Sequence, residues 1–215
     1  VNGKSVMCNI ALMNYTCNLD GNSEESADNE QSQYASPNGN HFVRVNDYNL
    51  ELCATLNGRC TQLTTDGTEH TPYAVKHPYP ESMLESSGFD AQKQLDIAWS
   101  DDGRYLISYK LFREGVSKLT LTDSVADNDF KVNAVNYYYP QAGDEHLPMA
   151  QPLLVDTKLE QATLLDAPNV MQTYYGGAIW GEWHGNEYYY HDRRRGNQSY
   201  FLRKVVAADK SVKTL

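Results

Sequence analysis

One hairpin sequence occurs twice in this chain, and this repetition constrains the fold more than any other feature. In residues 97–112 an apolar run ending in Trp99 precedes a Ser-Asp-Asp-Gly turn, and a run rich in aromatic and β-branched residues follows it. Gly103 stands where the turn needs a positive φ, which glycine adopts without steric cost. Residues 36–40, Ser-Pro-Asn-Gly-Asn, repeat this order before the strand-like run 41–45. Two copies of one hairpin predict a repeated β-structure.

The rest of the chain shows short alternating runs that are typical of strands, and it shows no long helical period. Such runs, joined by tight turns, form meanders within residues 34–67 and again within 174–206. We therefore predict an all-β fold, a partial β-propeller made of several blades of antiparallel meanders. Gly103 follows Gly39 by 64 residues, whereas a propeller blade usually has about 40–50 residues. A long loop predicted for residues 68–93 accounts for the excess.

The first part of the chain differs in character from the rest. Residues 1–19 contain two short alternating runs, which predict two strands of an incomplete sheet. Residues 20–33 contain almost nothing to bury and predict a mobile acidic loop. We therefore divide the chain into residues 1–33 and a propeller segment over residues 34–215.

Charge and histidine placement exclude several classes of function. The formal net charge is −10, and basic residues cluster densely only at residues 193–195, an Arg triplet. Phosphate contacts need clustered cations, so we expect no nucleic-acid partner and interpret the triplet as a hairpin end or as a partner of internal carboxylates. No apolar run has membrane-spanning length. His70 and His77 share a loop with Glu69 and Glu81, but loop histidines are usually solvated, so we expect no metal and no cofactor.

The four cysteines lack the CxxC spacing that is typical of metal sites. Cys53 and Cys60 flank the turn of a predicted hairpin, where opposed side chains can form a disulfide. Cys8 and Cys17 form the companion pair by the same hypothesis. Four reduced, buried thiols are the alternative. Disulfides would indicate an oxidising compartment, so we expect a periplasmic or secreted protein.

Three segments follow one another in a characteristic order. They are the meander 36–67, the hairpin Trp99-Ser100-Asp101-Asp102-Gly103-Arg104, and the segment Tyr139-Pro140-Gln141-Ala142-Gly143-Asp144-Glu145-His146-Leu147-Pro148. Together they resemble the N-terminal β-propeller region of the dipeptidyl peptidase IV family, which are S9-type, prolyl oligopeptidase-like serine peptidases. The resemblance covers roughly residues 34–215. Asp101 stands where proline is commoner, and His146-Leu147 replaces a usual Asn, without changing the hairpin.

The resemblance implies an eight-bladed propeller stacked on an α/β-hydrolase domain with a Ser-Asp-His triad. This sequence contains no Gly-x-Ser-x-Gly nucleophile motif. We therefore expect these residues to supply some blades and no hydrolase domain, no catalytic residue and no peptidase activity of their own. Their expected role is to gate the active-site cavity of a serine exopeptidase and to position peptide N-termini. The alternative is a stand-alone β-propeller or sandwich module that binds protein or carbohydrate ligands.

The family also binds the α-amino group of its peptide substrate with two adjacent glutamates that precede the Trp99-type hairpin. Two carboxylates can hold one ammonium group by charge-assisted hydrogen bonds. The corresponding residues 68–95 contain no Glu-Glu pair, and Glu81 and Glu85 are the nearest substrate-binding candidates. Ordinary solvated loop acids are the alternative reading. This departure leaves an aminopeptidase or oligopeptidase specificity open beside the dipeptidyl one.

A further implication of the resemblance is an arm that follows the Trp99-type hairpin and takes part in dimer contacts. Phe112–Tyr139 stands in the matching place. Val132, Val135 and the tyrosines at 137–139 can support a homodimer interface, whereas the acidic residues at 123–129 favour an exposed loop.

Overall fold

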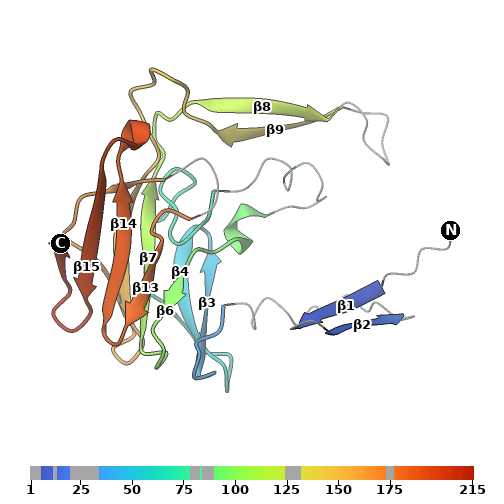
Figure 1. Cartoon of the computed structure of the whole chain (residues 1–215), viewed down its shortest axis with the longest axis vertical. Helices are drawn as coiled ribbons and strands as arrows, with labels where there is room; N and C mark the ends of the chain where they lie inside the picture. Colours follow the sequence, from blue (N-terminus) through green and yellow to red (C-terminus); the bar gives the residue numbers. More distant parts are fainter. Residues whose placement is uncertain are drawn as a thin grey trace. The chain divides into compact units, whose positions relative to one another are not determined.

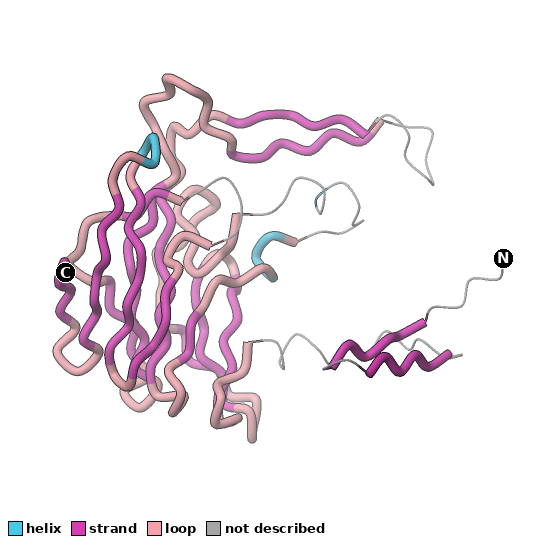
Figure 2. Tube along the Cα trace, in the orientation of Figure 1, coloured by secondary structure: helices cyan, strands magenta, loops and turns pink. Residues whose placement is uncertain are grey.

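Almost all of the regular structure in the described part of the chain is antiparallel β-sheet (Figure 2). The computed structural model describes residues 6–11, 14–19, 34–77, 83, 90–123, 132–172 and 177–215. The chain divides into two units, Val1–Gln33 and Tyr34–Leu215. In the first unit, β1 (Val6–Ala11) pairs with β2 (Asn14–Leu19), and Cys8 lies opposite Cys17. The acidic loop predicted for residues 20–33 lies outside the described residues.

The described part of the second unit contains three antiparallel sheets of three or more strands, which follow one another along the chain (Figure 1). Sheet 1 consists of β3 (His41–Asn46), β4 (Asn49–Ala54) and β5 (Cys60–Gln62). Sheet 2 consists of β6 (Ala98–Trp99), β7 (Tyr105–Phe112), β10 (Met149–Asp156) and β11 (Gln161–Leu164), and β12 (Val170–Met171) also pairs with β10. Sheet 3 consists of β13 (Gly181–His184), β14 (Glu187–Arg193), β15 (Tyr200–Val206) and β16 (Ser211–Thr214). The predicted all-β fold is confirmed.

A separate hairpin interrupts sheet 2 between β7 and β10. It is formed by β8 (Lys118–Asp123) and β9 (Asn133–Tyr138), which pair only with each other among the described strands. Figure 1 shows this hairpin extending away from the end of the sheets, in the place predicted for an arm. Two 3-10 turns, η1 (Ala91–Lys93) and η2 (Arg195–Asn197), complete the named elements.

The repeated hairpin sequence folds into two nearly identical turns. In both, the N–H of the glycine donates to the carbonyl of the serine three residues earlier, at 2.8 Å. The hydroxyls of Ser36 and Ser100 each accept the backbone N–H five residues later, at 3.1 and 2.8 Å. Gly39 and Gly103 have φ values of 70° and 67°. One local sequence therefore produces one turn geometry at the start of sheets 1 and 2.

Sheet 2 is buried on both faces because apolar clusters join it to both of its neighbours. Strand β7 shows the consequence, since all its residues except the last are buried. Residues that alternate along a strand point to opposite faces of the sheet. One cluster joins Val43, Leu50 and Leu52 of sheet 1 with Leu106, Leu153 and Val155 of sheet 2, and the other joins Ile107, Tyr109, Leu111 and Leu154 of sheet 2 with Tyr188, Tyr190 and Val205 of sheet 3.

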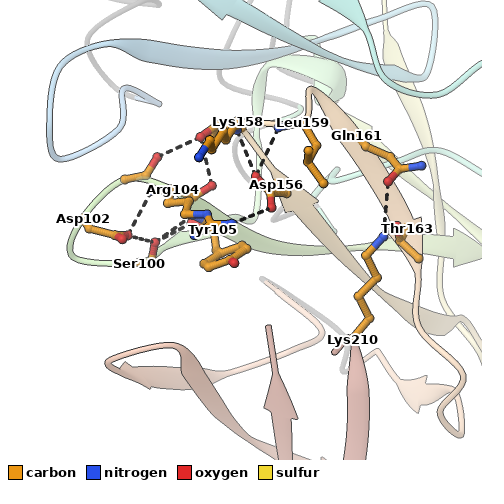
Figure 3. Close-up of polar contacts among 12 residues, drawn as sticks. Ser100, Asp102, Arg104, Tyr105, Asp156, Lys158, Leu159, Gln161, Thr163 and Lys210 are labelled. Atoms are coloured by element: carbon orange, nitrogen blue, oxygen red, sulfur yellow. Dashed lines mark hydrogen bonds and ion pairs between the residues drawn. The ribbon is translucent and has the colours of Figure 1, made fainter. Parts of the chain in front are cut away.

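Polar contacts link the turns of neighbouring sheets. Between sheets 1 and 2, the Asn38 side-chain amide donates to the Asp102 carbonyl (2.7 Å), and the Thr61 hydroxyl donates to the Glu160 carboxylate (3.1 Å). Between sheets 2 and 3, the Lys210 ammonium donates to the side chains of two β11 residues, Gln161 at 3.2 Å and Thr163 at 3.0 Å (Figure 3).

The third meander begins later than the sequence predicts. The sequence predicts this meander within residues 174–206, with residues 174–180 as its first strand-like run, but the strand that pairs with β14 is β13, which begins at Gly181. Residues 177–180 are not a strand, and residues 173–176 lie outside the described part. The backbone N–H of Ala178 donates to the carboxylate of Asp96 instead of to a neighbouring strand, so a side chain replaces a ladder hydrogen bond here.

Candidate functional site

The candidate site centres on Asp96, which lies two residues before β6. Its backbone N–H donates to the Ala74 carbonyl (2.7 Å), and its own carbonyl accepts the Ser108 hydroxyl (2.8 Å). These bonds hold the backbone of Asp96 between the residues that follow sheet 1 and strand β7. The position of its side chain is therefore set by segments that are distant in the sequence.

The Asp96 side chain is half-buried, and its carboxylate interacts with neutral donors and with the charge of Lys76. One oxygen, Oδ2, accepts the Ala178 N–H at 3.1 Å. Gly177 has room for no side chain, because a Cβ there would collide with this carboxylate. The Tyr109 hydroxyl lies nearby and donates to the Val75 carbonyl (3.1 Å). The carboxylate thus keeps lone pairs free for a further donor.

Burial raises the pKa of the Asp96 carboxyl above its ordinary value, while Tyr109, Lys76 and the Ala178 N–H act in the opposite direction. Burial also raises the pKa of Tyr109, so its hydroxyl stays protonated at neutral pH. Burial makes this carboxyl costly to ionise, and a nearby positive charge stabilises the ionised form. The site therefore favours a cationic ligand group.

A cavity of about 230 Å³ lies beside Asp96, between the first strands of sheets 2 and 3. Its lining combines polar groups with aliphatic and aromatic side chains, and its other residues are Ile97, Ala98, Ile107, Ser108, Tyr109, Ile179, Trp180, Gly181 and Tyr188. A small cavity with one carboxylate and several aliphatic side chains in its walls can take an ammonium group and a short apolar side chain. Leu95-Asp96-Ile97, an acid between apolar residues, is the sequence signal that could have identified this site.

The structure does not describe the two substrate-binding residues that the sequence predicts, since Glu81 and Glu85 lie outside the described residues. A disulfide joins Cys53 to Cys60 and links β4 with β5. Of the companion pair, Cys8 and Cys17 occupy directly opposed positions in β1 and β2.

Of the loop residues considered for a metal site, Glu69 and His70 have other partners, and Glu81 lies outside the described residues. Glu69 pairs with Lys118 (3.1 Å), and the Nδ1 of His70 lies 2.7 Å from the Tyr138 hydroxyl. Burial lowers the pKa of His77 to about 4, and the charge of Arg113 adds to this effect. Within the described residues, the one group with metal-ligand spacing is Glu51 with Cys53 and Cys60, and its two sulfurs form a disulfide. No helix in the described residues has the length and apolarity needed to cross a membrane.

Successive antiparallel meanders, packed sheet against sheet, are the arrangement of the blades of a β-propeller. A family model described as "Dipeptidyl peptidase IV (DPP IV) N-terminal region" matches residues 13–213. The chain belongs to this family, and the match begins earlier than residue 34, where the sequence resemblance begins. It is a peptidase-related segment.

Solved structures support the same fold. The chain is similar to dipeptidyl peptidase 4 of Porphyromonas gingivalis, with a TM-score of 0.58, 16% identity and coverage of 84% of this chain. It is also similar to a "putative dipeptidyl aminopeptidase IV" of Bacteroides ovatus, with a TM-score of 0.55, 15% identity and coverage of 85% of this chain. The match spans only 24% and 23% of those two chains, about a quarter of their length. Comparison with curated proteins gives no match. The predicted partial β-propeller is confirmed.

Proposed function

We propose that this chain forms part of the propeller of a serine exopeptidase of the dipeptidyl peptidase type. In this role it walls the substrate cavity, limits access to it, and holds the free amino end of a peptide for a hydrolase domain. The observation that carries the proposal is the Asp96 carboxylate beside a 230 Å³ cavity, in a chain whose family is the dipeptidyl peptidase IV N-terminal region.

The chemistry of the Asp96 cavity supports a peptide α-ammonium group as the ligand. The Ala178 N–H donates to one oxygen of the carboxylate. The Tyr109 hydroxyl donates to the Val75 carbonyl and also interacts with the carboxylate. An ammonium group adds charge-assisted hydrogen bonds, which are roughly twice as strong as neutral ones. The apolar walls formed by Ile107 and Ile179 suit the short side chain of an N-terminal residue.

Binding of a blocked and an unblocked peptide to the 215-residue chain tests this assignment. Ala-Pro-amide carries the α-ammonium group, whereas N-acetyl-Ala-Pro-amide lacks it, and neither has a carboxylate. We expect the free amine to bind at least about tenfold more tightly, since hydrogen bonds to charged groups are the strong ones. Asp96→Asn should abolish the difference.

Asp101→Asn is the matched control, because Asp101 is an exposed acid in the turn at the start of sheet 2. It removes the same charge and should leave both affinities unchanged. Equal binding of the two peptides to the folded parent chain would contradict the assignment, as would an equal loss in the two variants.

The arm formed by β8 and β9 is proposed to contribute to a homodimer. Leu119 and Leu121 lie on one face of the hairpin, where Val135 is the partner of Leu121 across the strands. These side chains are only half-buried, and an isolated two-stranded hairpin is marginally stable in water. Leu121→Lys should lower the association constant in sedimentation equilibrium, whereas Thr122→Lys on the opposite face should not. A dimer that survives Leu121→Lys would exclude this interface.

A periplasmic or secreted location is proposed from the Cys53–Cys60 disulfide. Structural disulfides persist in oxidising compartments and are rare where thiol-reducing systems operate. Trapping free thiols with a maleimide in intact cells tests this, because the cysteines should remain unlabelled until a reductant is added.

A further inference from the structure

Arg193, the last residue of β14, lies at the border of two adjacent cavities. The first, called here the aromatic cavity, has about 300 Å³ and includes Trp180, His191 and Tyr200 in its walls. The second, called the polar cavity, has about 510 Å³ and includes Gln141, Arg195 and Asn197. Arg193 and Met171 line both, so the two cavities meet at the guanidinium-bearing side chain.

The three arginines of the triplet have different roles. Arg194 pairs with the buried Asp192 carboxylate at 2.9 Å, and Arg195 donates to the Asp144 carbonyl. The backbone of Arg193 pairs with Tyr200 of β15, but among the described residues its side chain makes no hydrogen bond, ion pair or ring contact. It is only partly exposed, so its guanidinium faces the cavities without a compensating anion. Five N–H donors in a planar fork are suited to a carboxylate.

The walls of both cavities carry no negative charge. Among their described lining residues there is no Asp or Glu, although the chain has 28 acidic residues and a net charge of −10. The nearby Asp144 carboxylate is engaged with the Gln141 N–H (2.8 Å). His77 is neutral at pH 7, because burial lowers its pKa to about 4. The local charge is therefore positive.

The aromatic cavity presents two large rings to solvent. Trp180 is 64% exposed and Tyr200 is 59% exposed, whereas rings of this size are mostly covered in folded proteins. Flat exposed rings beside an unpaired guanidinium match a ligand that carries an apolar group next to an anion.

From this arrangement we propose that Arg193 binds a peptide carboxylate whose neighbouring aromatic or large apolar side chain enters the aromatic cavity. The carboxylate can be a C-terminal group or an acidic side chain. The site goes beyond the proposed function: it is a separate cavity, whose described lining shares Trp180 with that of the Asp96 cavity, and it recognises the opposite charge.

Three small ligands separate the contribution of the carboxylate from that of the aromatic ring. N-acetyl-phenylalanine has the ring and a terminal carboxylate, N-acetyl-phenylalaninamide has the ring alone, and N-acetyl-Phe-Asp-amide has the ring and a side-chain carboxylate. Titrations of the folded 215-residue chain followed by NMR should give at least about tenfold tighter binding of one or both acids than of the amide, since hydrogen bonds to ionised groups are the stronger ones. The tighter acid identifies the source of the carboxylate.

Three variants test whether the probes bind at Arg193 and the aromatic cavity. Arg193→Gln should lower the affinity for the acid to that of the amide, and Trp180→Ala should weaken acid and amide alike. Arg59→Gln removes the same charge from an exposed position in the turn after β4 and should have no effect. The proposal is overturned if acid and amide bind equally, if neither binds to the folded chain, or if Arg59→Gln matches Arg193→Gln.

Discussion

At the residue scale, Gly39 and Gly103 adopt the same backbone geometry, but only Gly103 is closely packed against another residue. A Cβ at Gly39 would meet nothing within 4 Å, whereas a Cβ at Gly103 would lie 2.5 Å from the Asn38 side-chain nitrogen. Asn38 cannot move freely, because its side chain bonds to Ser36, Asn40 and Asp102. Gly103 is therefore required for the approach of sheet 1 as well as for its positive φ.

This difference predicts unequal costs for the same substitution. Gly39→Ala should lower the free energy of unfolding by about 1 kcal/mol, the cost of a left-handed residue with a Cβ. Gly103→Ala should cost about 1 kcal/mol more, since displacing Asn38 breaks hydrogen bonds. Urea unfolding of both variants measures the two values. Equal costs would show that the contact with Asn38 carries no energy.

Asp96 predicts a pH-dependent change in stability. Its pKa is higher in the folded state than the ordinary value of 3.8, so the folded chain holds this proton more tightly than the unfolded chain does. Stability from this group is complete below 3.8 and is lost as the pH rises through the raised pKa. Asp96→Asn should therefore be more stable relative to the parent at pH 7 than at pH 3.5, as measured by urea unfolding at both values. The prediction is contradicted if the stability of Asp96→Asn relative to the parent is greater at pH 3.5 than at pH 7.

At the scale of elements, the residues just before β11 and β16 each bond to the neighbouring sheet. Glu160 and Lys210 precede β11 and β16, and both have positive φ values, 49° and 59°. Glu160 contacts Thr61 of β5, and Lys210 contacts Thr163 of β11. Equivalent turn positions thus bond to the outer strand of the preceding sheet, although their side chains have opposite charges.

The Cys53–Cys60 disulfide should matter most for β5, which has only three residues. The chain-entropy estimate for such a short loop is about 2.5 kcal/mol. Replacing both cysteines by alanine should therefore lower Tm by about 5–10 °C in a chain of this size. Thermal unfolding followed by circular dichroism measures this shift, with Leu56→Ala in the exposed turn as the control. An unchanged Tm would mean that β5 is held by its other contacts.

At the scale of the molecule, sheet 3 differs from sheet 2 because, within the described residues, apolar packing joins only one of its faces to a neighbouring sheet. Tyr200, Leu202 and Leu215 are 59%, 40% and 63% exposed, and the Leu215 N–H bonds to the Leu202 carbonyl. Exposed apolar patches on sheets promote association. The mass of the 215-residue chain in sedimentation equilibrium should therefore increase with concentration, and Leu202→Lys should reduce the increase. A Leu202→Lys chain that associates like the parent would assign association elsewhere.

The molecule as a whole is also expected to lack catalysis. It contains no Gly-x-Ser-x-Gly motif, and the proposed role of Asp96 is binding. The purified 215-residue chain should not release p-nitroaniline from an Ala-Pro-p-nitroanilide substrate. Cleavage that persists after independent purifications would contradict this.

The sequence alone determined the all-β class, the twice-repeated turn and the family, because turn chemistry and strand alternation are local properties. It also indicated the pairing of Cys53 with Cys60, since a hairpin brings them together over a short distance in the chain. Asp96 and Arg193 were not recognisable as site residues. Their cavities are built by segments that are far apart in the chain, such as Ala178 beside Asp96 and Gln141 near Arg193. Only the packing of sheet against sheet decides which charged groups have partners, because burial and pairing are properties of the folded chain.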